Sequence, residues 1–258
     1  MRKLSKSGIY IFCGIQTTMK KDLDFGSIDL GGEKRDTFTI HYEDAAIVAA
    51  EVPMKIYHPN KQNIMAHQEV VSSVMKKNNT VIPISFGNVF NSKDDVKHLL
   101  RSLYPQFSQI FPEIKGKMEL GLKVVAKDEW INQELSKRTD IQKQRQTVNN
   151  KSENAGYYDR IKLGGMAQNF FEILKKDIQK EVYQPLKSCA EASKSNEPIG
   201  EKMLLNASFL VDNEKEELFD VKVNEIHEHW KGKVDFHYTG PWPAYNFINI
   251  QLKVEKSS

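Results

Sequence analysis

The chain has 258 residues, of which 40% are hydrophobic, 10% aromatic and 28% charged. This composition is that of a globular protein and excludes collagen-like, coiled-coil and wholly disordered chains. Thirty-seven Lys and Arg against 34 Asp and Glu leave a formal charge of +3, too small and too dispersed for a dedicated nucleic-acid binder, so we expect no nucleic-acid partner.

The first half of the chain mixes strand and helix patterns. Residues 8–15 are apolar on both faces and predict a covered strand, and residues 38–42 and 45–52 predict a hairpin. Apolar residues at helical spacing predict one helix from 60 to 78. A second helix follows Ser92, and Pro105 and Pro112 punctuate a further helical stretch.

A new pattern starts near Gly116, so we expect an N-terminal α+β domain over 1–115 and a second domain over 116–258. Residues 118–126 alternate as a strand with Glu119 on its polar face. Residues 136–156 have few apolar side chains and form an exposed excursion, either an exposed helix or a mobile segment, rather than core. A long helix over 163–182 should end at Pro185, followed by a polar loop over 188–202. The remaining predicted elements are a strand at 203–211, a helix at 219–230 and strands at 234–238 and 248–254. This order fits a ferredoxin-like sandwich, and the fold class is α+β.

Cysteine usage and hydropathy indicate where the chain functions. Cys13 and Cys189 are the only cysteines, and neither has a CxxC motif or a Cys/His cluster beside it. The pattern excludes a disulfide framework and a structural zinc site and suits a reducing compartment, so we expect a cytoplasmic protein. No stretch approaches the ~20 apolar residues of a membrane-spanning helix, so we expect no lipid-membrane partner.

The most distinctive stretch runs from Gly240 to Phe247. Pro241 and Pro243 fix the backbone on both sides of Trp242, which therefore loses little entropy on contact with a partner. Together with Tyr245 and Phe247, these residues are the candidate partner-binding site. The alternative is a rigid crossover whose rings cover the end of the sheet.

A second irregularity is the run from Pro83 to Gly87. Proline cannot donate to a strand ladder, so this strand lies at a sheet edge or leaves the sheet. The edge could accept a strand from another chain, with Phe86 as a contact residue, although a strand that simply ends at a turn is favoured.

The sequence offers little catalytic chemistry. No GxSxG, HExxH, GxxxxGK[ST] or GxGxxG motif is present. His67 lies on the apolar stripe of its helix, as a core histidine does, and His227 and His229 are two residues apart, so they do not share a helix face. We expect no catalytic residue, no metal site and no cofactor.

The stretch from Gly240 to Trp242, with Pro243 and Tyr245 to Phe247, resembles the signature of the gas vesicle protein GvpF/GvpL family. Ala244 stands where the family usually has a second proline. The opening strand at Gly8, the His67 helix and the run from Pro83 to Gly87 match in order, although Asn88 stands where a threonine is common. The resemblance covers nearly the whole chain.

This resemblance implies two domains, the second a modified ferredoxin-like fold. It also implies a non-enzymatic accessory or minor structural role in gas vesicle assembly, with contact to the hydrophobic shell protein GvpA and to other Gvp proteins, and an association with the gas vesicle. The alternatives are an enzyme acting on a small molecule in the cleft between the domains, and a structural component of the vesicle wall.

Overall fold

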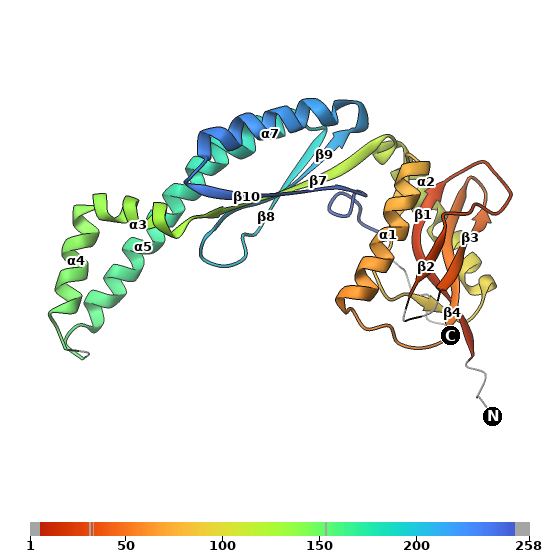
Figure 1. Cartoon of the computed structure of the whole chain (residues 1–258), viewed down its shortest axis with the longest axis horizontal. Coiled ribbons are helices and arrows are strands. Elements are labelled where there is room, and N and C mark those ends of the chain that lie inside the picture. The colour runs from red at the N-terminus through yellow and green to blue at the C-terminus, as the bar shows by residue number, and fades with distance from the viewer. Residues whose placement is uncertain (1–5, 31, 33, 153, 251–258) are drawn as a thin grey trace. The chain divides into compact units, whose positions relative to one another are not determined.

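The computed structural model describes residues 6–250 except 31, 33 and 153, and its contacts group them into two compact units (Figure 1). The first unit contains the described residues up to Glu119 together with those from Pro241 onward, and the second unit is Leu120–Gly240. The packing therefore joins the C-terminal segment to the first unit, whereas the expected domains kept all of 116–258 together. Whether either unit folds as an independent domain stays a prediction.

The first unit is an antiparallel sheet with one helix on each face. Its strand order is β2-β3-β4-β1-β5, and β6 also pairs with β1. The strands are β1 (Ser7–Gln16), β2 (Ser27–Asp29), β3 (Lys34–Tyr42), β4 (Ala45–Pro53), β5 (Val81–Pro83) and β6 (Val89–Phe90), and the helices are α1 (Lys61–Lys77) and α2 (Lys93–Ile114). The expected hairpin is the β3–β4 pair, whose turn holds Glu43 at φ 53°.

The two faces of β1 explain why residues 8–15 are apolar throughout. Tyr10 and Phe12 share a buried cluster with the α1 residues Val70 and Val74. Gly14 faces the other way, toward Phe107 of α2. Every residue from 8 to 15 is buried, as the sequence predicts for a strand covered on both sides.

The helix ends of the first unit follow from their capping residues. The Asn60 side chain accepts a hydrogen bond from the backbone N–H of Asn63, and that of Ser92 accepts one from Asp95. The helical stretch around Pro105 and Pro112 is not separate, because α2 runs through both prolines to Ile114. Each proline removes one N–H donor, and burial of the apolar face of α2 outweighs that loss.

The second unit is a four-stranded sheet in the order β10-β7-β9-β8. Its strands are β7 (Lys117–Ala126), β8 (Ala192–Asn196), β9 (Met203–Asp212) and β10 (Val234–Trp242). Its helices are α3 (Asp128–Lys137), α4 (Thr139–Asn149), α5 (Tyr157–Ile178), the π-helix η1 (Gln179–Tyr183), α6 (Gln184–Lys187), the 3₁₀ turn η2 (Asn213–Lys215) and α7 (Glu216–Trp230). β7 and the last strand, β10, each extend to the boundary with the first unit.

Two expected elements of the second half are wrong, and a third falls mostly outside the described residues. The polar loop over 188–202 contains β8, which pairs antiparallel with β9; its Ser, Lys and Asn residues give no apolar alternation because it is a largely exposed edge strand. Pro185 does not end the long helix, since it stands in the first turn of α6, where a missing N–H costs little. Residues 248–250 form no strand, and 251–254 lie outside the described residues.

The expected excursion over 136–156 is mostly helical. α4 packs against α5 through Ile141 and Gln144, which are 5% and 8% exposed. The Gln144 Nε2 group donates to the backbone carbonyl and to Oδ1 of Asp159 in α5, both at 3.1 Å. One apolar and one amide side chain therefore hold this otherwise exposed helix.

No helix among the described residues has the length and apolarity that crossing a bilayer requires.

The close approach of α2 to β1 gives a stability prediction. A Cβ at Gly14 would stand 2.9 Å from Cζ of Phe107, which is itself fully buried. We expect Gly14→Ala to lower the free energy of unfolding by about 1–3 kcal/mol through overpacking, measured by urea denaturation. Gly164→Ala is the matched control: no atom lies within 4 Å of its Cβ position in α5, so it should stabilise the chain by about 0.5–1 kcal/mol. Equal effects of the two substitutions would contradict the packing described.

Candidate functional site

The segment after β10 returns to the first unit and turns back on itself. The Tyr245 N–H donates to the Pro243 carbonyl at 2.6 Å, and the Phe247 N–H donates to the Ala244 carbonyl at 3.1 Å. Pro243 and Ala244 are buried, so the turn is seated on the protein. The segment is therefore ordered by its own backbone as well as by proline.

One buried carboxylate holds this turn. Glu119, near the start of β7, is 4% exposed, and its Oε2 accepts the backbone N–H of Asn246 at 2.7 Å. Its Oε1 accepts a second hydrogen bond from the Asn246 side-chain amide. The two bonds join residues 127 positions apart in the chain and give the buried carboxylate two donors.

Tyr245 combines a hydroxyl that is shielded from solvent with a substantial exposed fraction. Burial raises the pKa of its hydroxyl to about 12, with further contributions from Cys13 and Glu119. The hydroxyl therefore lies near buried groups, while 43% of the residue stays exposed. A partly exposed tyrosine on a backbone segment that is already held can contact a partner with little further ordering.

A second polar contact of the first unit is formed around Tyr10 of β1. The Tyr10 hydroxyl accepts the Gly87 N–H at 2.9 Å and pairs with Nδ1 of His67 at 3.0 Å. Burial raises the pKa of Tyr10 to about 12; the Gly87 N–H opposes the rise, whereas Tyr57 and Tyr245 add to it. Tyr10 and His67 are therefore both neutral and share a hydrogen bond, and the Tyr10 hydroxyl fixes the backbone of the turn after β5.

The six predicted partner-binding residues have different surroundings. Tyr245 and Pro241 are exposed, Trp242 and Phe247 are half-buried, and Pro243 is buried. Phe86 is half-buried, and its ring centroid lies 6.0 Å from Tyr10 and 5.8 Å from His67. Phe86 thus lies near Tyr10, and Tyr245 is close enough to help raise the pKa of the Tyr10 hydroxyl, although Phe86 and Tyr245 are far apart in the chain.

The sequence missed Glu119, Asn246 and Tyr10. Alternation along β7 placed Glu119 on a solvent face, yet the carboxylate is buried because the returning segment covers it there. No local sequence pattern can indicate a contact between positions so far apart in the chain. Tyr10 appeared only as one apolar residue of a buried strand.

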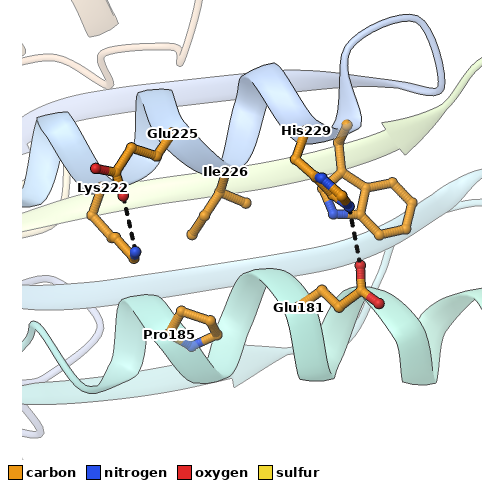
Figure 2. A pocket seen from close by; sticks show the side chains of 7 residues that line it. Glu181, Pro185, Lys222, Glu225, Ile226 and His229 are labelled. Carbon is orange, nitrogen blue, oxygen red and sulfur yellow. Dashed lines mark hydrogen bonds and ion pairs between the residues drawn. The ribbon is translucent and has the colours of Figure 1, made fainter.

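A pocket of about 230 Å³ lies in the second unit between η1–α6 and α7. Figure 2 shows Glu181 and Pro185 on one side and residues of α7 on the other. Its ionisable side chains lie close to one another: Lys222 Nζ lies 2.9 Å from Glu225 Oε2, and His229 Nε2 lies 3.8 Å from Glu181 Oε2. No group of three potential metal ligands occurs among the residues that the structure describes.

Comparison with known proteins gives one consistent family. Residues 8–249 match the family model described as gas vesicle synthesis protein GvpL/GvpF. Gas vesicle protein F1 of Halobacterium salinarum is 23% identical over 240 residues, 92% of each chain. Gas vesicle protein F of a Nostoc species is 24% identical over 219 residues, 83% of this chain and 86% of the relative.

Two crystal structures share the fold. GvpF from an Anabaena species has a TM-score of 0.79 at 21% identity, covering 95% of this chain and all of that one. GvpF from Microcystis aeruginosa has a TM-score of 0.74 at 17% identity, covering 93% and 98%. The likeness extends over both compact units.

The Glu119 contact generates a prediction about the C-terminal segment. Glu119→Ala removes both acceptors and leaves the Asn246 N–H without its partner, which costs about 1–3 kcal/mol. We expect faster amide hydrogen exchange at Asn246 and faster proteolysis within 241–250. Glu134→Ala, which removes an exposed i,i+3 ion pair in α3, is the control and should change neither. Unchanged exchange at Asn246 in the Glu119 variant would contradict the anchoring role.

The buried histidine predicts a pH dependence of stability. Burial lowers the pKa of His67 to about 4, with a small opposing effect of the Ile84 backbone, whereas the unfolded value is near 6.5. The unfolded chain therefore binds more protons between these values, and stability is lost as the pH falls from about 6.5 to about 4, by up to about 3 kcal/mol. His67→Gln keeps an acceptor for Tyr10 without the titration. We expect its unfolding free energy to decline less steeply than that of the wild type, and parallel curves would show that His67 is not buried as neutral imidazole.

Proposed function

Because the chain belongs to the gas vesicle synthesis protein GvpL/GvpF family, we propose that it is a non-enzymatic accessory protein that binds the hydrophobic shell protein GvpA and other gas vesicle proteins during vesicle formation. Membership of the family implies a role in gas vesicle formation. Binding of the shell protein is the more specific part of the proposal.

The need for such a factor follows from the surface of the shell protein. A wall that faces gas requires an apolar surface, and exposed apolar patches larger than a few hundred Å² drive association. A protein that covers this surface in the cytoplasm would hold the subunit until it joins the wall. The cysteine pattern of the chain is compatible with that compartment.

The exposed Tyr245, carried on a backbone segment that is already held, supports the proposal most directly. Its segment is held by the hydrogen bonds from Asn246 to Glu119, so it is ordered before any partner arrives. Trp242 and Phe247, both half-buried, flank it and could extend the contact as the partner docks. Tyrosine and tryptophan in such settings contribute a large share of binding energy at interfaces.

The architecture supports a two-domain description, with a modified ferredoxin-like second domain. The elements of the second unit run strand, helices, strand, strand, helix, strand, and its sheet order is β10-β7-β9-β8. This order of elements and strands supports the proposed split βαβ, ferredoxin-like description. The modification we propose is the helical insertion α3–α4 after β7, together with the extension of β10 toward the first unit.

Two other functions remain to be compared with this proposal. A wall component would stay with purified vesicles after washing, whereas an assembly factor would be found mainly in the soluble fraction. An enzyme would need an arranged nucleophile and base; the charged groups around the pocket of Figure 2 instead pair with one another.

The proposal predicts the effect of removing the exposed ring. Tyr245→Ala should weaken binding to GvpA, carried on a soluble fusion partner, by about 30-fold, equivalent to about 2 kcal/mol. Met65→Ala removes an exposed apolar side chain of α1 and serves as the control with unchanged affinity. Wild-type affinity in a folded Tyr245→Ala protein would remove this residue from the interface, and loss of thermal stability with unchanged affinity would assign the ring to the core.

Ligand-induced shifts in Tm distinguish an accessory function from an enzymatic one. A ligand that binds only the native state at one hundred times its Kd adds about 2.7 kcal/mol, which raises Tm by about 5–10 °C in a chain of this size. We expect a rise with soluble GvpA and a flat response to ATP, GTP, magnesium and zinc. A reproducible shift with a nucleotide or metal, and none with any vesicle protein, would favour the enzyme.

A further inference from the structure

The last strand of the second unit, β10, is an edge strand with a free outer side. It stands at the end of the strand order β10-β7-β9-β8. Apart from its pairing within the sheet, residues 234–240 make no backbone hydrogen bond in the described part of the chain. An edge of this kind exposes a row of N–H and C=O groups with which another strand can pair.

The contacts of β10 with β7 determine which of its backbone groups face outward. The Lys127 N–H of β7 donates to the Lys233 carbonyl at 3.0 Å. Earlier in β7 and later in the partner strand, a Cβ at Gly121 would stand 2.9 Å from Thr239 Oγ1. The strands are therefore antiparallel, and the odd-numbered residues of β10 direct their N–H and C=O groups toward β7. The outward-facing N–H and C=O groups are those of Val234, Phe236, Tyr238 and Gly240.

β10 lacks the features that protect the other sheet edges. β2, β5 and β6 are only two or three residues long, and β8 has Lys194 at its centre. Residues 234–240 contain neither lysine nor proline. Their single carboxylate, that of Asp235, is paired with Lys127 Nζ at 3.1 Å. Short strands, lysine and proline are the usual means of blocking strand addition, so β10 is the edge best suited to accept a strand.

The side chains of β10 divide between a covered face and an open face. The ring centroid of Phe236 lies 5.2 Å from that of His227 in α7, and the Tyr238 hydroxyl donates to Asp220 Oδ1 of α7 at 2.6 Å. Both rings are only half-buried, although they lie on the helix-covered face. The exposed residues of the open face are Asp235, His237 and Thr239.

We propose that β10 pairs antiparallel with β10 of a second copy of this chain, about a two-fold axis at His237. In this register the outward-facing residues oppose one another: position 234 meets 240 of the second copy, and 236 meets 238. Each such pair exchanges two backbone hydrogen bonds, so the two sheets become continuous. The inference goes beyond the proposed function and does not rest on it, because the partner is a second copy rather than a vesicle protein.

A second copy fits this edge because the side chains are complementary to their own copies. On the α7 side, Phe236 lies opposite Tyr238 of the second copy, an aromatic cross-strand pair of the kind that stabilises sheets. On the open face, Asp235 lies opposite Thr239 of the second copy, so no two carboxylates oppose each other. The contact uses the same patch on both copies and closes on itself, as the commonest homodimers do.

The contact is small, so the dimer should be weak. Only residues 234–240 pair, and interfaces below ~1,200 Å² are typical of transient association. We expect the weight-average mass from sedimentation equilibrium to rise toward that of a dimer, and not beyond it, as the concentration of the full chain reaches about 0.5 mM.

A symmetric cross-link tests both the pairing and its register, in a Cys189→Ser background where the remaining native Cys13 is buried. His237→Cys places the introduced thiols opposite each other in a non-hydrogen-bonded pair, with Cα atoms about 4.5 Å apart and within reach of a disulfide. Thr239→Cys is the matched control on the same face, because its two copies lie about 13 Å apart at ~3.3 Å per residue. Under mild copper-catalysed air oxidation, we expect the covalent dimer to form at least about tenfold faster at position 237.

A charge at the two-fold axis tests the association without a cross-link. His237→Lys sets two ammonium groups against each other and should weaken dimerisation at least about fivefold. Ser195→Lys adds the same charge to the exposed edge strand β8 and should leave dimerisation unchanged. Both substituted side chains are exposed, so each variant should keep its Tm within about 3 °C of the wild-type value.

Three outcomes would overturn the proposal. Equal rates of cross-linking at positions 237 and 239 would indicate random collision rather than a fixed register. Equal loss of association in the Ser195→Lys control would make the effect one of net charge. A chain that stays monomeric up to about 0.5 mM, with exchange of the 234–240 amides slowed only by soluble shell protein, would assign the edge to a strand of that partner instead.

Discussion

The carboxylate of Glu119 and the amide groups of Asn246 form the contact on which the candidate site depends. The chain leaves the first unit near Glu119, builds the whole second unit and returns, and this pair joins the exit to the return. A buried carboxylate with two N–H donors needs both partners in place, so the return segment has one favoured position. Trp242, Tyr245 and Phe247 are positioned by that constraint rather than by the prolines alone.

The first unit supplies a stiff base for this segment. Its central strand β1 is buried on both faces, and the hydrogen bonds of Tyr10 connect that strand to α1 and to the turn at Gly87. Tyr245 and Phe86 both lie near Tyr10, so the two irregular stretches of the sequence, 83–87 and 240–247, are close to the same buried side chain. The exposed charged and apolar side chains of the second unit lie instead on α7 and on the α4–α5 hairpin. Few side chains are buried there, so the residue type at each position is less restricted.

The elements that periodicity and capping determine could be predicted from the sequence. β1, the β3–β4 hairpin, α1 with its Asn60 cap and α7 with its buried stripe follow from local patterns. β8 could not be predicted, because an exposed edge strand needs no apolar alternation. The continuation of the helix through Pro185 could not be predicted either, because it depends on the π-helical turn before the proline. For the site, the aromatic segment was visible as a sequence irregularity. Its anchor at Glu119 was not, because a contact across 127 residues leaves no local pattern.

Hydrogen exchange of the full chain with and without soluble shell protein tests the central claim most directly. We expect added protection at the amides of 242 and 244–249, with little change in 139–162, because the partner docks on the segment held by Glu119. Unchanged exchange across 241–250, with protection gained elsewhere in the chain, would contradict it.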